Sequence, residues 1–170
     1  AAPGRFVDPF VTADGSRRAS VAQTRLETLW FNTGSLCNIA CANCYIESSP
    51  TNDALTYLTV EDVARYLAEI ADAGLPTREI EPFMNPGILT MLEATLGAGH
   101  EALVLTNAMR PMLRWGDRLA DLAAAHRKRL TFRVSLDHHT EAVHDAERGA
   151  GSWDTAWKGL DWLAAHNLRI

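Results

Sequence analysis

All three cysteines of the chain lie close together, as Cys37, Cys41 and Cys44 in a CxxxCxxC arrangement. Three thiols cannot all pair off, and this spacing would give strained loops, so a secreted disulfide framework is not expected. Three thiolates can instead wrap one small metal cluster. A [4Fe–4S] cube has four irons, so three cysteines leave one iron open to an outside ligand. The spacing therefore predicts a reactive iron–sulfur centre.

A structural zinc site is the competing interpretation of this loop. Such a site normally closes four ligands, commonly as two CxxC-type pairs. The chain has no second pair, and the nearest histidine in sequence, His100, lies far along the chain. Three buried cysteines without a metal are favoured even less, because the loop lacks the pattern of an apolar helix face. We therefore favour the cluster over zinc.

The composition fits a single soluble domain, because 47% of the 170 residues are hydrophobic and 22% are charged. The formal net charge is −5 and no dense run of Lys and Arg occurs, which argues against a nucleic-acid partner. The apolar runs are shorter than the roughly 18 residues of a membrane span, and the first residues lack the shape of a signal peptide. We expect a cytoplasmic protein. The chain starts without Met and ends on an apolar stretch, so we also expect a fragment.

Strands and helices alternate around the cysteine loop. Residues 1–25 lack periodicity and predict an irregular arm. Predicted strands span 26–33, 102–105 and 130–136, with another starting at 168–170. Predicted helices span 59–73, 85–97, 116–127 and 152–165, with Thr59, Asn85 and Ser152 as N-terminal caps. Trp153 and Trp157 are expected to pack inward, and the continuous apolar run at 102–105 predicts a strand covered on both faces.

This alternation predicts right-handed βαβ crossovers and a parallel sheet with helices outside it. In such sheets the chemistry lies on the loops after the carboxyl ends of the strands. The cysteine loop follows the first predicted strand, Thr106 and Asn107 follow the second, and Ser135 and Asp137 end the third. We expect these polar groups to converge on one rim.

At these residues the sequence resembles the radical S-adenosylmethionine (radical SAM) superfamily, over roughly residues 28–170. Its cluster motif matches the three cysteines, although many members carry an aromatic residue where this chain has Asn43, just before the last cysteine. Glu81-Pro82 and the following residues resemble the end of the family's Gly-Gly-Glu-Pro segment. The stretch from Ser135 to Gly149 resembles its S-L-D…H-D-x-x-R-G pattern.

The resemblance implies a partial (β/α)6 barrel, with about four of six βα units present in an incomplete core domain over 26–170. It implies a [4Fe–4S] cluster held by Cys37, Cys41 and Cys44, with SAM chelating the open iron. One electron from the reduced cluster then cleaves SAM to methionine and a 5′-deoxyadenosyl radical, which abstracts hydrogen from a substrate. The electron donor would be flavodoxin-like or ferredoxin-like.

The resemblance also implies roles for residues around SAM. Glu81 and adjacent backbone would hold the amino group, and Arg148 would face the carboxylate. The adenosyl side would be lined by Thr106, Asn107, Ser135 and Asp137. The alternative for each is a helix cap, a strand-end hydrogen bond or a surface charge. The substrate, a small molecule or a peptide, and any catalytic residue remain unassigned, because later strands build that pocket.

The segment before Glu81 departs from the family, because Glu79 and Ile80 stand where the two glycines are expected. The helix at 59–73 would be about 22 Å long, and residues 74–81 reach at most about 23 Å when extended. We infer a shortened segment that weakens SAM binding, since side chains would crowd the approach that glycine permits.

Two alternatives follow from this departure. One is a non-catalytic iron–sulfur or metal-binding fragment that has lost productive SAM binding, and the other is a purely structural α/β domain. A separate mononuclear metal site at Asp137, His138, His139 and His144 is less favoured than a substrate-facing role for that segment.

Overall fold

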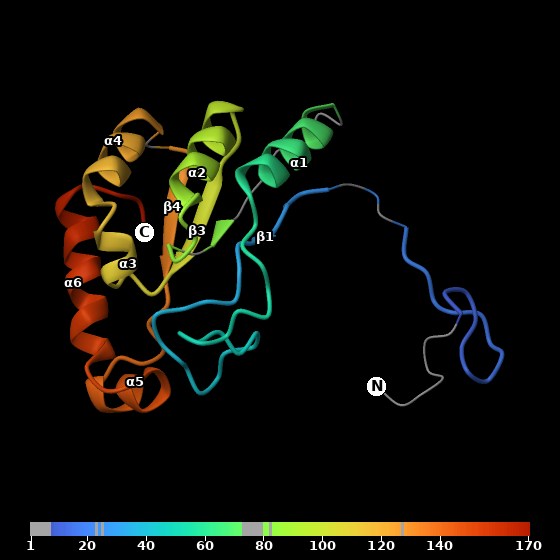
Figure 1. Ribbon diagram of the computed structural model, residues 1–170, viewed down its shortest axis with the longest axis horizontal. Helices are drawn as coiled ribbons and strands as arrows, with labels where there is room; N and C mark the ends of the chain where they lie inside the picture. Colours follow the sequence, from blue (N-terminus) through green and yellow to red (C-terminus); the bar gives the residue numbers. More distant parts are fainter. Residues whose placement is uncertain (1–7, 23, 25, 73–79, 82, 127) are drawn as a thin grey trace.

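Four parallel strands form one sheet in the order β1-β2-β3-β4 (Figure 1). The computed structural model describes residues 8–22, 24, 26–72, 80–81, 83–126 and 128–170. The strands are β1 (Phe31–Asn32), β2 (Ile80–Glu81), β3 (Ala102–Thr106) and β4 (Leu130–Val134). Ile80 pairs with both Phe31 and Val104, while β3 and β4 pair along their whole length. Arg169 forms a parallel bridge with Thr131, where a further strand was expected.

The helices alternate with these strands. They are α1 (Val60–Asp72), α2 (Ile88–Gly97), α3 (Arg110–Leu113), α4 (Gly116–His126), α5 (Glu141–Arg148) and α6 (Ser152–Ala165). The sequence predicts α1, α2, α4 and α6 but not β2, α3 or α5. Helix α1 packs on α2, α2 on α4, and α6 on both α3 and α5. Figure 1 shows α1 beside the β1 edge of the sheet and α6 beyond β4. Within the described residues, no helix is long and apolar enough to cross a membrane.

The core lies between the helices and one face of the sheet. Alternate residues of β3 and β4, including Val104 and Phe132, are buried against α2 side chains such as Ile88 and Leu92. Leu103 and Leu105, on the other face of β3, are only half-buried. The expectation that β3 is covered on both faces is therefore wrong. Leu105 is apolar because it lines a cavity rather than a second layer of helices.

The first predicted helix has the cap that its sequence suggests. The backbone N–H of Asp62 donates to Thr59 Oγ1 at 3.1 Å, and the Asp62 carboxylate accepts from the Thr59 N–H at 3.3 Å. The Asn85 cap is wrong, because α2 begins at Ile88 with Gly87 before it. The buried Asn85 amide instead donates to the carbonyls of Thr33 and Leu58, at 3.0 and 2.9 Å. It thereby joins the start of the cysteine segment to the chain before α1.

Helix α6 has the predicted bounds but a different cap. Gly151 stands at the N-cap, and the Asp145 carboxylate of α5 accepts from the backbone N–H groups of Gly151 and Trp153 at 2.6 and 2.8 Å. The sequence assigns no helix between the strand at 130–136 and the helix at 152–165, and α5 (Glu141–Arg148) fills much of that interval. Trp157 does not pack inward, because 42% of it is exposed.

The segment before β1 contains no helix or strand in its described part, apart from a bridge between Val11 and Arg17 (Figure 1). The strand expected at 26–33 is shorter, because only Phe31 and Asn32 find partners in the two-residue β2. The shortened connection at 73–79 and Pro82, including the position of Glu79, lies outside the described residues.

Gly159 of α6 sets how closely this helix approaches the turn after β3. A Cβ atom at position 159 would lie 1.7 Å from the Ala108 carbonyl oxygen. Ala108 is buried and has φ of 57°, a left-handed conformation that costs a non-glycine residue about 1–2 kcal/mol. The turn therefore has no space to retreat from a side chain on α6.

We expect Gly159→Ala to lower the free energy of unfolding by about 1–3 kcal/mol, because the added methyl group overpacks against backbone. Urea denaturation followed by circular dichroism measures this. Gly97→Ala is the matched control, since an added Cβ there meets nothing within 4 Å, and it should raise stability by about 0.5–1 kcal/mol. Equal stability of the two variants would contradict the packing argument.

Candidate active site at the cysteine loop

Two backbone hydrogen bonds hold the cysteine loop in place. The N–H of Cys37 donates to the Ser49 carbonyl at 3.0 Å, which closes the loop on itself. The N–H of Ala42 donates to the Glu147 carbonyl at 2.8 Å, which fixes the middle of the loop to the end of α5. The loop has no regular secondary structure, so these bonds set where its three thiols lie.

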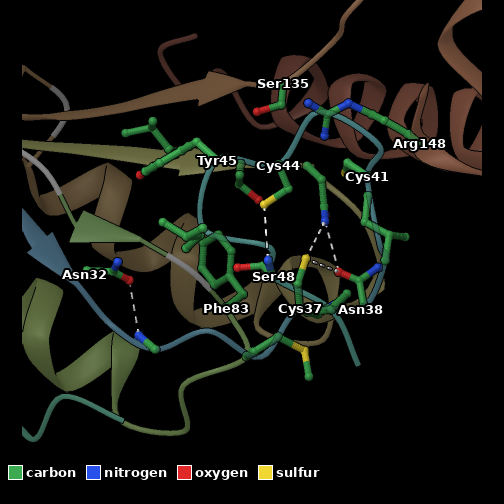
Figure 2. A pocket seen from close by; sticks show the side chains of 18 of the residues that line it. Asn32, Cys37, Asn38, Cys41, Cys44, Tyr45, Ser48, Phe83, Ser135 and Arg148 are labelled. Atoms are coloured by element: carbon green, nitrogen blue, oxygen red, sulfur yellow. Dashed lines mark hydrogen bonds between the residues drawn. The ribbon is translucent and has the colours of Figure 1, made fainter. Parts of the chain in front are cut away.

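A cavity of about 400 Å³ opens over this loop, a size typical of small-molecule sites. Figure 2 shows the three cysteines on its wall, with Ser135 and Arg148 beside them. The strand ends contribute Phe83, Met84, Leu105, Thr106, Asn107, Ser135 and Asp137 to the same wall. The convergence on one rim that the sequence predicts is therefore observed for these residues.

Hydrogen-bond donors approach two of the sulfurs. The backbone N–H of Ser48 donates to Cys44 Sγ at 3.2 Å (Figure 2). The Asn107 amide lies 3.9 Å from Cys37 Sγ. The same Asn107 amide donates to Asn38 Oδ1 at 2.9 Å, which ties the loop to the end of β3. Hydrogen bonds to cluster sulfurs are one of the means by which a protein sets a reduction potential.

Two side chains of the turn after β3 hold its backbone and so direct Asn107. Thr106 Oγ1 accepts from the N–H of Ala108 at 3.0 Å, and Asn107 Oδ1 accepts from the N–H of Met109 at 3.1 Å. Asn107 is thus fixed through its oxygen, which leaves its amide nitrogen for the cysteine loop. Gly159 lies against this turn, so the packing of α6 also supports the position of Asn107.

Arg148 and Asp137 form a bidentate ion pair on the cavity wall. Arg148 Nε and Nη2 donate to the two Asp137 carboxylate oxygens at 2.6 and 2.9 Å. These hydrogen bonds hold the pKa of Asp137 below its ordinary value of 3.8. Burial, the largest single influence, acts to lower the pKa of Arg148, but the hydrogen bond and charge of Asp137 together with the nearby Cys41 and Cys37 raise it overall. In the described part of the chain, Arg148 Nη1 makes no hydrogen bond.

His144 holds the segment that carries Asp137. It is fully buried in α5, and its Nδ1 accepts from the Asp137 N–H at 3.3 Å. Among the described residues, the other ring nitrogen, Nε2, has no partner. The ring meets the edge of Trp153 at a centroid distance of 5.6 Å. His144 thus anchors the loop after β4 instead of facing solvent.

The thiols fit a cluster better than a single metal ion. Within the described residues, no three His, Cys, Asp or Glu side chains come together closely enough to hold one ion. None of the three described cysteines forms a disulfide, and all three are half-buried on the wall of one cavity, as expected when each bonds a different iron of a cubane. Burial raises the pKa of the Cys41 thiol and Arg148 partly opposes that rise. Metal loading would therefore displace a proton there.

The profile of the Radical SAM superfamily matches residues 31–170, which is most of the chain. The chain belongs to the radical SAM superfamily. Membership implies a [4Fe–4S] cluster and SAM as cofactors, and implies an enzyme. The CxxxCxxC motif and the extent of the resemblance found in the sequence are confirmed.

Two known proteins show how this radical SAM chain relates to longer ones. It is 30% identical to the antilisterial bacteriocin subtilosin biosynthesis protein AlbA of Bacillus subtilis (strain 168), over 79% of this chain and 30% of AlbA. Crystal structures of Streptococcus suis SuiB share its fold. The SAM-bound one has a TM-score of 0.65 at 18% identity, covering 84% of this chain and 32% of SuiB. The chain spans about a third of the length of these relatives.

Several residues expected to contact SAM already form contacts within the protein, or have side chains that the structure does not describe. Asp137 engages Arg148, and Thr106 is buried with its hydroxyl bonded in the turn. The backbone of Glu81 pairs with Asn32, but its side chain lies outside what the structure describes. Sequence reasoning did not single out Asn38, although a polar amide inside the CxxxC spacing was a usable signal. It also missed His144 as an anchor, because its burial depends on α5.

We expect Asp137→Asn to lower the free energy of unfolding at pH 7 by about 2 kcal/mol, because it leaves the partly buried Arg148 without its charged partner. The folded-state pKa of Asp137 is depressed, so the ion pair stabilises the fold above pH 3.8 and is lost as the pH falls through that depressed pKa. The difference between the two proteins should therefore narrow below pH 3.8.

Urea denaturation at a series of pH values measures the difference. Asp121→Asn, on the exposed side of α4, is the control and should follow the wild type throughout. If the difference in unfolding free energy between wild type and Asp137→Asn stayed constant from pH 7 down to pH 3, the ion pair would not be the cause of the lower stability.

Proposed function

We propose that this chain is the core of a radical SAM enzyme, in which Cys37, Cys41 and Cys44 hold a [4Fe–4S] cluster and the cavity beside them binds SAM. The observation that carries the proposal is the gathering of three cysteines without a disulfide on the wall of one cavity, together with polar groups from the strand ends. We further propose that residues 26–170 form part of a (β/α)6 barrel, since the parallel sheet has helices along one face and a cavity along the other.

When both cofactors are bound, the reduced cluster supplies the electron that cleaves SAM to methionine and a 5′-deoxyadenosyl radical, which takes a hydrogen atom from a substrate. The chain contributes binding, orientation and shielding from water. Its apolar wall, including Leu105 and Phe83, limits the water that reaches the reacting groups. The donors from Ser48 and Asn107 would lower the charge on the cluster sulfurs.

We propose that Arg148 binds the carboxylate of SAM. Its Nε and Nη2 are held by Asp137, so the guanidinium is oriented before SAM arrives and Nη1 keeps its donors. Ser135 lies on the same cavity wall, and we assign it with Thr106, Asn107 and Asp137 to the adenosyl side. Glu81 and the backbone after β2 would take the amino group. Phe83 and Met84, which follow them, line the cavity.

We propose a peptide substrate, on the basis of AlbA, whose name places it in the biosynthesis of a bacteriocin. A flavodoxin-like or ferredoxin-like protein would supply the electron, and three cysteines without a disulfide fit the reducing cytoplasm. The net charge of −5 supports neither nucleic acid nor an anionic membrane as a partner.

Anaerobic reconstitution tests the proposal. We expect about four irons per wild-type chain, and release of 5′-deoxyadenosine when SAM and dithionite are added. Cys37→Ala, Cys41→Ala and Cys44→Ala should each lose the visible absorbance of the cluster and all of this release. Thr51→Ala, at an exposed position in the same segment, should retain both. A colourless wild-type protein with one zinc would overturn the proposal.

The second candidate is a non-catalytic iron–sulfur fragment, favoured by the absence of the family's two glycines before Glu81. The same reconstituted protein separates the two. If it holds the cluster but neither binds SAM at micromolar concentration nor releases 5′-deoxyadenosine, the fragment is correct. Measurable SAM binding would contradict the loss of SAM binding that we infer from the absence of the two glycines.

A further inference from the structure

A second cavity lies on the other side of the cysteine loop. Its volume is about 710 Å³, and its wall is built from the residues between the first two cysteines, the α3 segment and the start of α6. Asn38, Ile39, Pro111 and Arg148 line both cavities, so the loop is the partition between them. The cavity proposed for SAM takes up one side of this partition, and nothing described above uses the other.

The charged side chains on the wall of this second cavity are all arginines, namely Arg110, Arg114 and Arg148. No Asp or Glu lines it among the described residues, although the chain as a whole has a net charge of −5. Two carboxylates of the neighbouring segments are engaged, since Asp137 pairs with Arg148 and Asp145 caps α6. The cavity is therefore a local region of positive charge on an acidic chain.

The three arginines differ in whether their guanidinium groups already form hydrogen bonds within the protein. Arg148 is held by Asp137, and Arg114 Nη2 donates to the Phe83 carbonyl at 2.8 Å. Arg110 is exposed at the start of α3, and no partner for it is found in the described part of the chain. Its guanidinium is thus available to a carboxylate from outside. An acidic protein that pairs with Arg110 would lie against Ile39 and Ala40, inside the span of the loop that joins Cys37 to Cys41.

We propose that this surface, lined by Arg110, Arg114 and residues 38–40, is the docking site of an acidic low-potential electron-transfer protein such as a flavodoxin. The inference rests on the proposed function, because it needs a cluster on the cysteine loop. The donor is oxidised by one electron and the cluster is reduced by one, with no bond formed or broken. The path is short because the loop alone separates the surface from the thiols.

Charge complementarity favours this occupant. Transient redox complexes bury little surface and depend on electrostatic steering, so a few exposed arginines without competing carboxylates suffice to orient the partner. Docking on this side also leaves the cavity that holds Ser135 and Asp137 open to SAM and substrate, so reduction and substrate binding do not exclude each other.

Titration calorimetry of the reconstituted chain with a recombinant acidic flavodoxin at low ionic strength tests the proposal. We expect Arg110→Glu to weaken binding about tenfold and Arg110→Lys to retain most of it, with the difference shrinking as salt is added. Arg65→Glu is the matched control, because Arg65 is exposed on α1 at the opposite edge of the sheet (Figure 1). It should bind as the wild type does.

Three results would overturn the docking site: no binding by the wild type, equal binding by Arg110→Glu and Arg65→Glu, or an Arg110-dependent affinity for a Glu-rich peptide alone. The last would assign the cavity to an acidic substrate segment. Dithionite reduction of the cluster, followed by its visible absorbance, should be the same in all variants. Failure of reconstitution would contradict the proposed function. If dithionite still reduces the cluster and Arg110→Glu binds flavodoxin as the wild type does, only the docking site is contradicted.

Discussion

The cysteine loop has no helix or strand to hold it, so its shape depends on hydrogen bonds to the carboxyl ends of the strands and to α5. Ala42 is bonded to Glu147, and Asn38 is bonded to Asn107 in the turn after β3. That turn is itself held against Gly159 of α6, where no side chain would fit. A cluster that must keep one iron open needs three thiols in fixed relative positions. The parallel sheet supplies that constraint by bringing segments distant in sequence to one rim.

Positive charge is placed on both sides of this loop for different purposes. On the cavity side, Arg148 is oriented by Asp137, whose backbone is in turn anchored by the buried His144. On the other side, Arg110 is exposed, and no Asp or Glu lines the second cavity among the described residues. A fixed cation suits a small ligand that must bind in one orientation, and an exposed cation suits a protein partner that must find the surface quickly. On the two proposals made above, a single loop separates ligand binding from electron delivery.

Local patterns in the sequence predict the CxxxCxxC motif, the strands β3 and β4, the helices α1, α2, α4 and α6, and the Thr59 cap, because each depends on residues a few positions apart. They fail where distant contacts decide. Asn85 has the sequence of a cap but joins two carbonyls far away in the chain, and α6 is capped by a carboxylate from α5. The apolar run of β3 has the pattern of a strand buried on both faces, yet one face lines a cavity. The pattern of apolar residues in a sequence shows which side chains are apolar, but it does not show whether helices or a ligand cover them.

Mössbauer spectroscopy of the anaerobically reconstituted chain, enriched in isotopic iron and recorded with and without SAM, tests the central claim most directly. The account predicts a cubane spectrum in which one iron of the four changes its parameters when SAM is added, because that iron has no cysteine ligand. A spectrum without a cubane would contradict the assignment of the three thiols. A cubane whose irons all remain unchanged with saturating SAM would contradict the assignment of the cavity beside them.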